Sequence, residues 1–339
     1  MVRSNKPSAI GLGASLPQST VSINDNVVEA SLPSGESVAI HLYGATVTSW
    51  KAFGQEQLFL SEKAHLDGSK PIRGGIPLVF PVFGPPPQNH VTSPLPQHGF
   101  ARNSNWEYLG KSAAEAADNQ GKQAVKLDFG LSHTMLSEEF RKAWPYGFGL
   151  VYSVTLTKTS LQTQLQVRNE GTQNFEFQVL MHTYLNIAVC FKPTLLAIFG
   201  DHPSKAHRTA QDISNIRVKN LESKTYVDKV RDATTHTETS PALAITGETD
   251  RVYQNLDPAV PIIVSSASDD SPLFTITREA LADVVVWNPW IEKAKGMADF
   301  GPDEAYKNMI CVEAGSVSGW QTLEAGDSWE GGQTIKSRL

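Results

Sequence analysis

Residues 149–167 read GLVYSVTLTKTSLQTQLQV and contain two consecutive runs rich in β-branched, aromatic and other apolar residues. In the second run, Leu161, Thr163, Leu165 and Val167 alternate with glutamines. A period of two places those four side chains on one side of a strand and the glutamines on the other. The stretch therefore predicts two successive strands, at least one of them with a buried face and a polar face.

Short segments of the same character extend from this stretch in both directions. They lie at residues 21–23, 27–32, 37–42, 45–50, 175–187, 273–278, 283–290 and 309–315. Regularly spaced short strands separated by turn residues are typical of an all-β sandwich, which is the fold class we predict. Helical character is confined to residues 137–143 and 303–307, and residues 292–308 otherwise read as a charged connection.

The length of 339 residues corresponds to one large domain or two ordinary ones. Sandwiches reach this length as single domains, and no internal repeat or domain linker is evident in the sequence. We therefore expect residues 21–339 to form one domain. Residues 1–20 are rich in Ser, Pro and Gly, and we expect this N-terminal segment to be disordered.

The composition argues against several classes of binding partner and against a disulfide or metal framework. The net charge is −6 and no basic run occurs, so we expect no nucleic-acid partner. The two cysteines, Cys190 and Cys311, provide neither a disulfide framework nor a metal cluster. The N-terminus lacks an apolar export core, and no window approaches the ~18 apolar residues of a membrane span. We expect a cytoplasmic monomer with no membrane partner.

Residues 71–102 contain too much Pro and Gly for central strands and are interpreted as long shaped loops, where functional residues are common. Arg73 and Arg102 lie beside glycines in this region and could hold an anion through forked hydrogen bonds. Surface salt bridges are the alternative. Gln97 and His98 precede Gly99, where a ligand can approach the backbone closely, although a simple turn would explain them too.

Two polar residues occur within or at the end of apolar strands. His182 lies in the middle of residues 178–187, and a satisfied core histidine is the commoner explanation for such a residue. Glu313 ends the apolar run Ile310-Cys311-Val312, where desolvation is expected to raise its pKa toward that of a general base. His182 is then a candidate for the complementary acid. A carboxylate facing water at a strand end is the alternative for Glu313.

Asp250 follows Gly247-Glu248-Thr249 and is a further candidate, with a turn or capping role as the alternative. Asp250 and Glu313 also leave open a glycosidase pair of carboxylates. The sequence lacks a phosphate-binding Gly-Lys-Ser/Thr loop, a dinucleotide-binding Gly-x-Gly-x-x-Gly and a Gly-x-Ser-x-Gly elbow. Its nine histidines show no metal-ligand spacing, so we predict neither a metal nor a cofactor.

Six motifs occur in order: PIRGGIP at 71–77, QHGFAR at 97–102, HTY at 182–184, GETDRVY at 247–253, VVWNPW at 285–290 and CVEAG at 311–315. Together they resemble the glucose-6-phosphate 1-epimerases, the hexose-6-phosphate mutarotase branch of the aldose 1-epimerase superfamily. The resemblance extends from about residue 20 to the C-terminus.

This resemblance implies a large antiparallel β-sandwich of the galactose mutarotase type, with its site in a cleft on the concave face of one sheet. The implied reaction interconverts the α and β anomers of hexose 6-phosphates, chiefly glucose 6-phosphate, without a cofactor. The implied roles are a general base for Glu313, a general acid for His182, substrate binding for Arg73, Gln97 and Arg102, and a sugar-hydroxyl contact for Asp250. A non-catalytic sugar-phosphate sensor on the same fold is the alternative, although the presence of both His182 and Glu313 favours the enzyme.

Residues 189–211 depart from the pattern of the family, which would pass from residue 188 almost directly to residue 212. The segment fits no strand or helix period and is longer than most structureless loops. One hypothesis is a retained intron, because Val-Cys and Ala-Gln at its ends can be encoded by intron boundary sequences and its 23 residues keep the reading frame. The other is a genuine surface loop.

Overall fold

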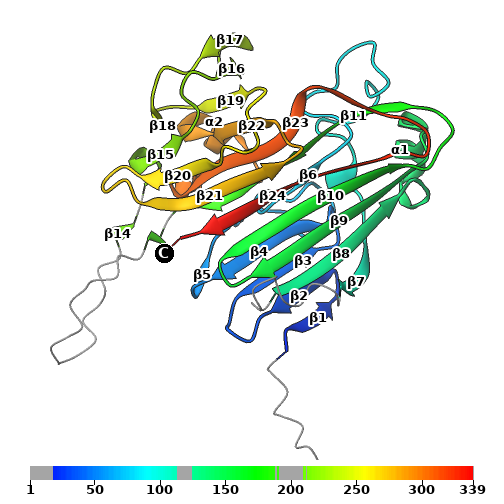
Figure 1. Cartoon of the computed structure of the whole chain (residues 1–339), viewed down its shortest axis with the longest axis horizontal. Helices are drawn as coiled ribbons and strands as arrows, with labels where there is room; N and C mark the ends of the chain where they lie inside the picture. The colour runs from blue at the N-terminus through cyan, green and yellow to red at the C-terminus, as the bar shows by residue number, and fades with distance from the viewer. Residues whose placement is uncertain (1–17, 113–123, 188, 191–208, 211, 339) are drawn as a thin grey trace, which may run out of the picture.

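The structure is a computed structural model that describes residues 18–112, 124–187, 189–190, 209–210 and 212–338. Within these ranges the chain forms sheets of five, nine and eight strands and one two-stranded ladder. The strand pairings in all of them are antiparallel, so the predicted all-β antiparallel sandwich is confirmed. Figure 1 shows the N-terminal strands in blue at one side of the molecule and the strands from β15 to β22 at the other.

The five-stranded sheet is a simple meander of consecutive strands. Its order is β1 (Thr20–Asn24), β2 (Val27–Ser31), β3 (Ser37–His41), β4 (Thr46–Ala52) and β5 (Gln55–Glu56). Along β2, Val28 and Ala30 are buried whereas Glu29 between them is exposed. One face of this sheet is therefore in the core, as the alternation of the sequence predicts.

The nine-stranded sheet contains the two strands that identify the fold class. Its order is β18 (Ala242–Ala244), β15 (Ile216–Lys219), β20 (Ile262–Ser266), β21 (Pro272–Glu279), β24 (Ser328–Ser337), β10 (Ser160–Asn169), β9 (Phe148–Thr157), β8 (Ala124–Ser132) and β7 (Glu107–Ser112). Leu161, Thr163, Leu165 and Val167 of β10 are fully buried and the intervening glutamines are not, which confirms the predicted two-faced strand.

The eight-stranded sheet is built around the long strand β23. Its order is β17 (Thr234–Thr237), β16 (Thr225–Asp228), β19 (Thr249–Tyr253), β22 (Asp283–Asn288), β23 (Met309–Leu323), β11 (Phe175–Met181) and β6 (Leu78–Val79), and β12 (Tyr184–Asn186) also pairs with β23. Strands β22 and β23 contain almost only buried residues over Asp283–Asn288 and 309–317.

The nine- and eight-stranded sheets pack face to face. The Thr163 hydroxyl of β10 donates to the Met181 sulfur of β11 at 3.0 Å, and the Gln333 amide of β24 donates to the Thr183 hydroxyl at 2.7 Å. Met181 and Thr183 therefore point into the space between the two sheets. His182 lies between them in the chain, so the alternation of a strand directs its side chain to the opposite face of the eight-stranded sheet.

The core contains an aromatic cluster centred on Phe80. The Phe80 ring lies 5.5–6.0 Å, centroid to centroid, from the rings of Phe100, Trp144, Phe148 and Phe177. All five side chains are fully buried. Tilted and edge-on contacts at these distances add to the hydrophobic stabilisation of the core. The cluster joins the loop after β6 to strands β9 and β11.

Helices are few and short. They are α1 (Glu138–Ala143), α2 (Trp290–Gly296) and four 3₁₀ turns: η1 (Ala101–Asn103), η2 (His133–Met135), η3 (Ile213–Asn215) and η4 (Asp303–Asn308). Helical structure at α1 and η4 was expected, whereas α2 was expected to be part of a charged connection. It begins directly after Pro289, whose φ is −70°, and the Asn288 side chain accepts the Trp290 N–H at 2.9 Å. Among the described residues no helix is long and apolar enough to cross a bilayer.

The predicted strand over residues 175–187 is interrupted at His182 and Thr183. β11 ends at Met181 and β12 begins at Tyr184, and the Thr183 N–H donates back to the Met181 carbonyl at 2.8 Å. The His182 N–H donates to the Pro77 carbonyl at 3.0 Å, in the same antiparallel register that pairs β11 with β6. The loop that contains Pro77 therefore holds the backbone of His182.

Two predicted segments fall mostly outside the described residues. These are the N-terminal segment 1–20, of which residues 18–20 are described, and the atypical segment 189–211. At the base of the second, β13 (Val189–Cys190) pairs antiparallel with β14 (Thr209–Ala210). The retained-intron hypothesis remains a prediction.

Replacement of Phe80 by Ala is expected to lower the free energy of unfolding by about 3–5 kcal/mol, because it removes the central ring of a buried cluster. Ile23→Ala is the matched control, since Ile23 is 55% exposed on β1 and should change stability by less than about 0.5 kcal/mol. Urea unfolding followed by tryptophan fluorescence measures both variants. Equal midpoints for the two would contradict a central role for the Phe80 cluster.

Candidate active site

His182 and Glu313 are neighbours across two strands of the eight-stranded sheet. Met181 pairs with Ala314 and Tyr184 pairs with Cys311, so the same register places His182 opposite Glu313. His182 Nδ1 lies 3.2 Å from Glu313 Oε1, and both side chains are about nine-tenths buried or more. Although the two atoms are within ion-pair distance, Nδ1 has no hydrogen-bond partner among the described residues. We interpret the contact as a close approach without a formed hydrogen bond.

Burial disfavours charge on both members of this pair. It raises the pKa of Glu313 well above its usual range; nearby Asp250 raises it further, and Lys229 and Arg102 partly offset the rise. Burial lowers the pKa of His182 well below its ordinary value, and Arg102 and Arg73 lower it further. These two shifts favour a protonated Glu313 beside a neutral His182 imidazole.

A second row of side chains lies on the same face, one step along the sheet. Tyr184 pairs with Cys311, Cys311 with Trp287, and Trp287 with Asp250. The Tyr184 ring stacks on His182 at 4.7 Å, and the Trp287 ring meets His182 edge-on at 6.1 Å. The two rings thus provide an apolar surface beside His182 and Glu313. The register of β19 thus brings Asp250 to the face that carries His182 and Glu313.

Arg73 reaches the pair from the loop after β5. Its guanidinium donates to the Tyr184 hydroxyl at 3.1 Å and to Asp299 at 3.2 Å. Both contacts raise the pKa of Arg73, the effect of Tyr184 being the larger. Because Asp299 also approaches a second guanidinium nitrogen at 3.1 Å, the positive charge of Arg73 is already compensated by a carboxylate.

Arg102 lies in η1, and Gln97 precedes that turn by four residues. Arg102 donates to the Gln97 backbone carbonyl at 3.0 Å, whereas its buried Nε has no hydrogen-bond partner among the described residues. Burial lowers the pKa of Arg102 to about 10. The Gln97 side chain is exposed, and its amide lies 3.3 Å from His98 Nε2. The structure thus brings all six predicted site residues to one region, with Gln97 at its edge.

Two further side chains belong to this region. The His98 ring lies 6.0 Å from the His182 ring, and its Nδ1 accepts the Gly84 N–H at 3.2 Å. Its motif QHGFAR was evident in the sequence, although no role followed for the histidine itself. Lys229 follows β16 and interacts electrostatically with both His182 and Glu313. Nothing in the sequence distinguishes this lysine from an ordinary surface lysine.

Glycines let the site loops approach the strands closely. A Cβ on Gly75 would lie 2.0 Å from the Val47 carbonyl oxygen, and one on Gly99 would lie 2.1 Å from the Phe80 carbonyl oxygen. Both residues also have φ near +70°, a conformation that L-residues rarely adopt. The turns beside Arg73 and His98 therefore depend on glycine at these positions, which explains the Pro- and Gly-rich sequence of residues 71–102.

His182, Cys311 and Glu313 each offer one potential ligand atom, and these atoms lie within 4.8 Å of one another. Burial raises the pKa of the Cys311 thiol well above its usual range, with a further contribution from Glu313. A metal ion requires the thiolate, which this environment disfavours, and three cationic side chains lie nearby. The electrostatics of the cluster fit acid–base chemistry better than metal binding.

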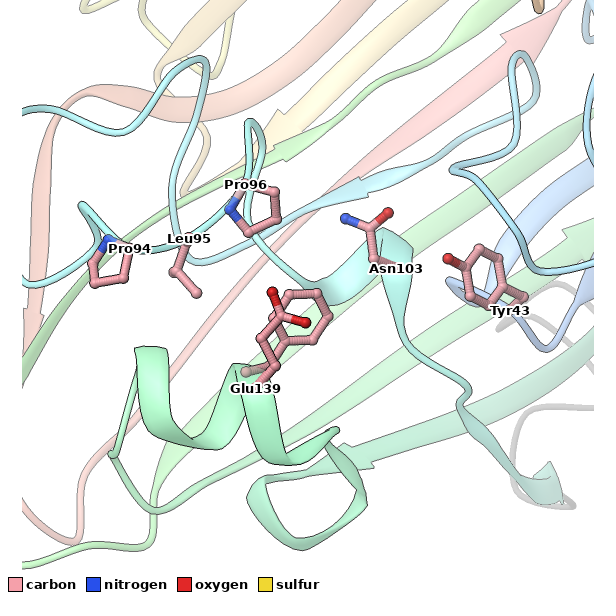
Figure 2. A pocket seen from close by; sticks show the side chains of 7 residues that line it. Tyr43, Pro94, Leu95, Pro96, Asn103 and Glu139 are labelled. Atoms are coloured by element: carbon pink, nitrogen blue, oxygen red, sulfur yellow. The ribbon is translucent and has the colours of Figure 1, made fainter.

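A separate pocket of about 470 Å³ lies beside η1 (Figure 2). It is lined by Tyr43, Pro94, Leu95, Pro96, Asn103, Glu139 and Phe140. None of the six predicted site residues lines it. This pocket is therefore separate from the face of the eight-stranded sheet that carries His182, Glu313 and Asp250.

Comparison with known proteins decides the family. A family model described as aldose 1-epimerase matches residues 26–336. The chain belongs to the aldose 1-epimerase family. A sugar-epimerase or mutarotase activity follows from this membership, in agreement with the resemblance of the six motifs.

Named relatives within this family are similar over most of the chain. A protein of Cenchrus ciliaris named "Putative glucose-6-phosphate 1-epimerase" is 35% identical over 296 residues, which cover 86% of this chain and 78% of the relative. A protein of Escherichia coli K12 with the same name is 32% identical over 285 residues, covering 83% and 80%.

Solved structures confirm the fold of this member of the family. A crystal structure from Salmonella typhimurium described as a putative mutarotase has a TM-score of 0.73 and 27% identity, and the match covers 96% of each chain. A galactose mutarotase-like protein from Clostridium acetobutylicum has a TM-score of 0.65 at 17% identity, covering 94% of this chain and 98% of the other. The second likeness concerns the fold alone.

Glu313→Gln is expected to stabilise the protein increasingly as the pH rises. The carboxyl of an unfolded glutamate ionises near pH ~4.3, whereas buried Glu313 keeps its proton to a higher pH. Folding therefore takes up a proton, and this group lowers stability as the pH rises above the unfolded value. The Tm of the variant minus that of the wild type should grow between about pH 5 and about pH 8.

Differential scanning calorimetry across this range measures the effect. Glu29→Gln, at an exposed position of β2, is the control and should give a flat difference. A difference that is equally flat for Glu313→Gln would show that Glu313 is ionised in the folded protein.

Proposed function

We propose that this aldose 1-epimerase interconverts the α and β anomers of hexose 6-phosphates, chiefly glucose 6-phosphate. The observation that carries the proposal is the buried approach of His182 Nδ1 to Glu313 Oε1 at 3.2 Å, next to the cationic side chains of Arg73, Arg102 and Lys229. The pair fits proton transfer at a sugar anomeric centre, and the cations fit a phosphate. The names of the relatives in Cenchrus ciliaris and Escherichia coli support the same substrate.

In the proposed reaction, Glu313 takes the proton of the C1 hydroxyl while His182 gives a proton to the ring oxygen. The bond between C1 and the ring oxygen breaks, and the ring opens to the aldehyde. Rotation about the C1–C2 bond presents the other face of the aldehyde. The two proton transfers then run in reverse and close the ring as the other anomer.

One proton shared by the pair is sufficient for this cycle, because each step needs one acid and one base. In the absence of ligand, burial places that proton on Glu313. A hydrogen bond from the C1 hydroxyl to the carboxylate favours the ionised form of Glu313 and thereby moves the proton to His182. Substrate binding thus prepares the base and the acid together.

The remaining contacts orient the substrate. Asp250, on the same face as the pair, is proposed to accept a hydrogen bond from a sugar hydroxyl, and Trp287 supplies an apolar wall for the ring. Arg73, Gln97 and Arg102 are proposed to hold the phosphorylated end. The protein is further proposed to act as a monomer in the cytoplasm without a cofactor.

An anomerisation assay tests the proposal. Pure α-glucose 6-phosphate is followed by polarimetry and by NMR of the anomeric proton, with galactose and mannose 6-phosphates measured in parallel. Wild-type protein should accelerate equilibration. Glu313→Gln should reduce kcat by about 10²–10⁴-fold, the usual contribution of one general base, while calorimetric binding of glucose 6-phosphate persists.

Glu324→Gln is the matched control, because Glu324 is exposed just beyond the end of β23. Its rate should equal that of the wild type. An unchanged rate in Glu313→Gln would refute its assignment as the base. Binding without any acceleration by the wild-type protein would instead identify a sugar-phosphate sensor.

A further inference from the structure

Two polar side chains of the nine-stranded sheet lie behind the strand segment that carries His182. Thr163 and Gln333 face each other across β10 and β24, and both are buried between the sheets. The Thr163 hydroxyl contacts the Met181 sulfur, and the Gln333 amide contacts the Thr183 hydroxyl. Burying polar groups in a core costs free energy, which the hydrogen bonds that they form must offset.

The interruption of the strand at His182 is held from three directions. The His182 N–H donates to the Pro77 carbonyl at 3.0 Å, and the Thr183 carbonyl accepts the Val312 N–H at 3.2 Å. These contacts hold the backbone from the loop side and from β23. From the third side, which is the space between the sheets, the Gln333 amide donates to the Thr183 hydroxyl at 2.7 Å.

The direction of this last hydrogen bond follows from the Thr183 hydroxyl. The hydroxyl donates its one proton to the Met181 carbonyl at 3.2 Å, so its oxygen accepts from Gln333. The Thr183 N–H donates to the same carbonyl at 2.8 Å. The Gln333 amide therefore orients the hydroxyl, and the hydroxyl and the N–H together close the tight turn on which His182 lies.

The other half of the Gln333 amide is not satisfied. Its Oε1 is buried and has no hydrogen-bond partner among the described residues. A buried acceptor without a partner costs more free energy than an apolar side chain of similar size would at this position. Core stability alone therefore does not explain a glutamine here, whereas the donor that it offers to Thr183 does.

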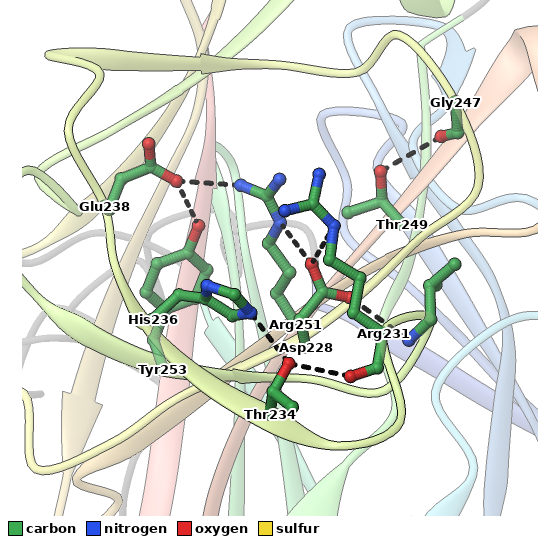
Figure 3. A network of polar contacts seen from close by, with 10 residues as sticks. Asp228, Arg231, Thr234, His236, Glu238, Gly247, Thr249, Arg251 and Tyr253 are labelled. Carbon is green, nitrogen blue, oxygen red and sulfur yellow. Dashed lines mark hydrogen bonds and ion pairs between the residues drawn. The ribbon is translucent and has the colours of Figure 1, made fainter.

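The network around Arg251 is a contrasting case, in which buried polar groups have a structural purpose (Figure 3). Glu238 accepts hydrogen bonds from Arg251 at 2.9 Å and from the Tyr253 hydroxyl at 2.8 Å. Asp228 lies 3.6 Å from Arg251 Nε and accepts the Val230 N–H at 3.1 Å. These groups satisfy one another and fix the turn after β16. None of their hydrogen bonds within the described residues involves the acid–base pair.

We propose that Gln333 is a positioning residue that orients His182 through the hydroxyl of Thr183. The inference rests on the proposed function, in which His182 protonates the ring oxygen of the sugar. Proton transfer depends on the distance and angle of the acid, so a loosened turn would lower kcat and leave the substrate contacts intact. The nine-stranded sheet, which carries none of the six site residues, thereby contributes to catalysis.

Gln333→Met removes the donor and keeps a side chain of similar length. It is expected to lower kcat for glucose 6-phosphate by about tenfold to a hundredfold and to change KM by less than about twofold. The Tm should fall by a few degrees, as for one lost buried hydrogen bond. Thr183→Val should lower kcat as much, whereas Thr183→Ser, which keeps the hydroxyl, should retain most of it. The double variant Gln333→Met/Thr183→Val should lose no more than either single variant, because both changes remove the same hydrogen bond.

Tyr253→Phe is the matched control. It removes a buried hydrogen bond of 2.8 Å to Glu238, so it should lower the Tm to a similar extent and leave kcat at the wild-type value. An unchanged kcat in Gln333→Met would overturn the proposal. An equal loss of kcat in Tyr253→Phe would overturn it too, because it would show that a general loss of stability lowers the activity. Where Gln333→Met does not fold, equal kcat values for Thr183→Val and Thr183→Ser would overturn the proposal.

A spectroscopic measurement separates this inference from the proposed function. Long-range proton–nitrogen NMR spectra report on histidine ring nitrogens, and the signals of His182 are those that His182→Asn removes. Gln333→Met should shift or broaden these signals, whereas Tyr253→Phe should leave them in place. If the wild-type protein accelerates no anomerisation, the proposed activity is wrong and the His182 signals decide. Unchanged signals in Gln333→Met would then reject the positioning role.

Discussion

The antiparallel register between β23 and the broken strand β11–β12 is the constraint on which the site depends. It places His182 directly opposite Glu313 and turns both side chains away from the space between the sheets. A shift of one residue would send either side chain into the core. The buried sulfur of Met181 and the hydroxyl of Thr183 contact the nine-stranded sheet and thereby oppose such a shift.

The free-energy cost of burying His182 and Glu313 is lower when both side chains are uncharged. A buried carboxylate and a buried imidazolium would each require compensation, whereas a protonated Glu313 beside a neutral imidazole leaves both groups uncharged. The surrounding apolar wall of Tyr184 and Trp287 maintains this condition. Because both side chains are buried, a bound sugar would meet groups whose protonation responds strongly to new hydrogen bonds.

The charged side chains around the pair are arranged by two different means. Arg73 and Arg102 come from loops whose glycines press against neighbouring strands, and Asp250 comes from the ladder itself. Lys229 is positioned by the network around Arg251, on the side of the sheet farthest from β6. A site built from both loops and strands can keep its acid–base pair fixed while its outer contacts follow the ligand.

The sequence by itself determined the all-β class, because the alternation of Leu161, Thr163, Leu165 and Val167 is a local property of a strand. It also identified His182 and Glu313 as unusual, since each is a polar residue within an apolar run. Their pairing, the break after Met181, the helix α2 and the proximity of Lys229 to the pair could not be predicted in this way. They depend on strand register and on contacts between residues far apart in the chain, such as His182 with Pro77 and Lys229 with Phe83. Local patterns encode which face of a strand is buried, whereas only the assembled sheets decide which buried or exposed groups meet.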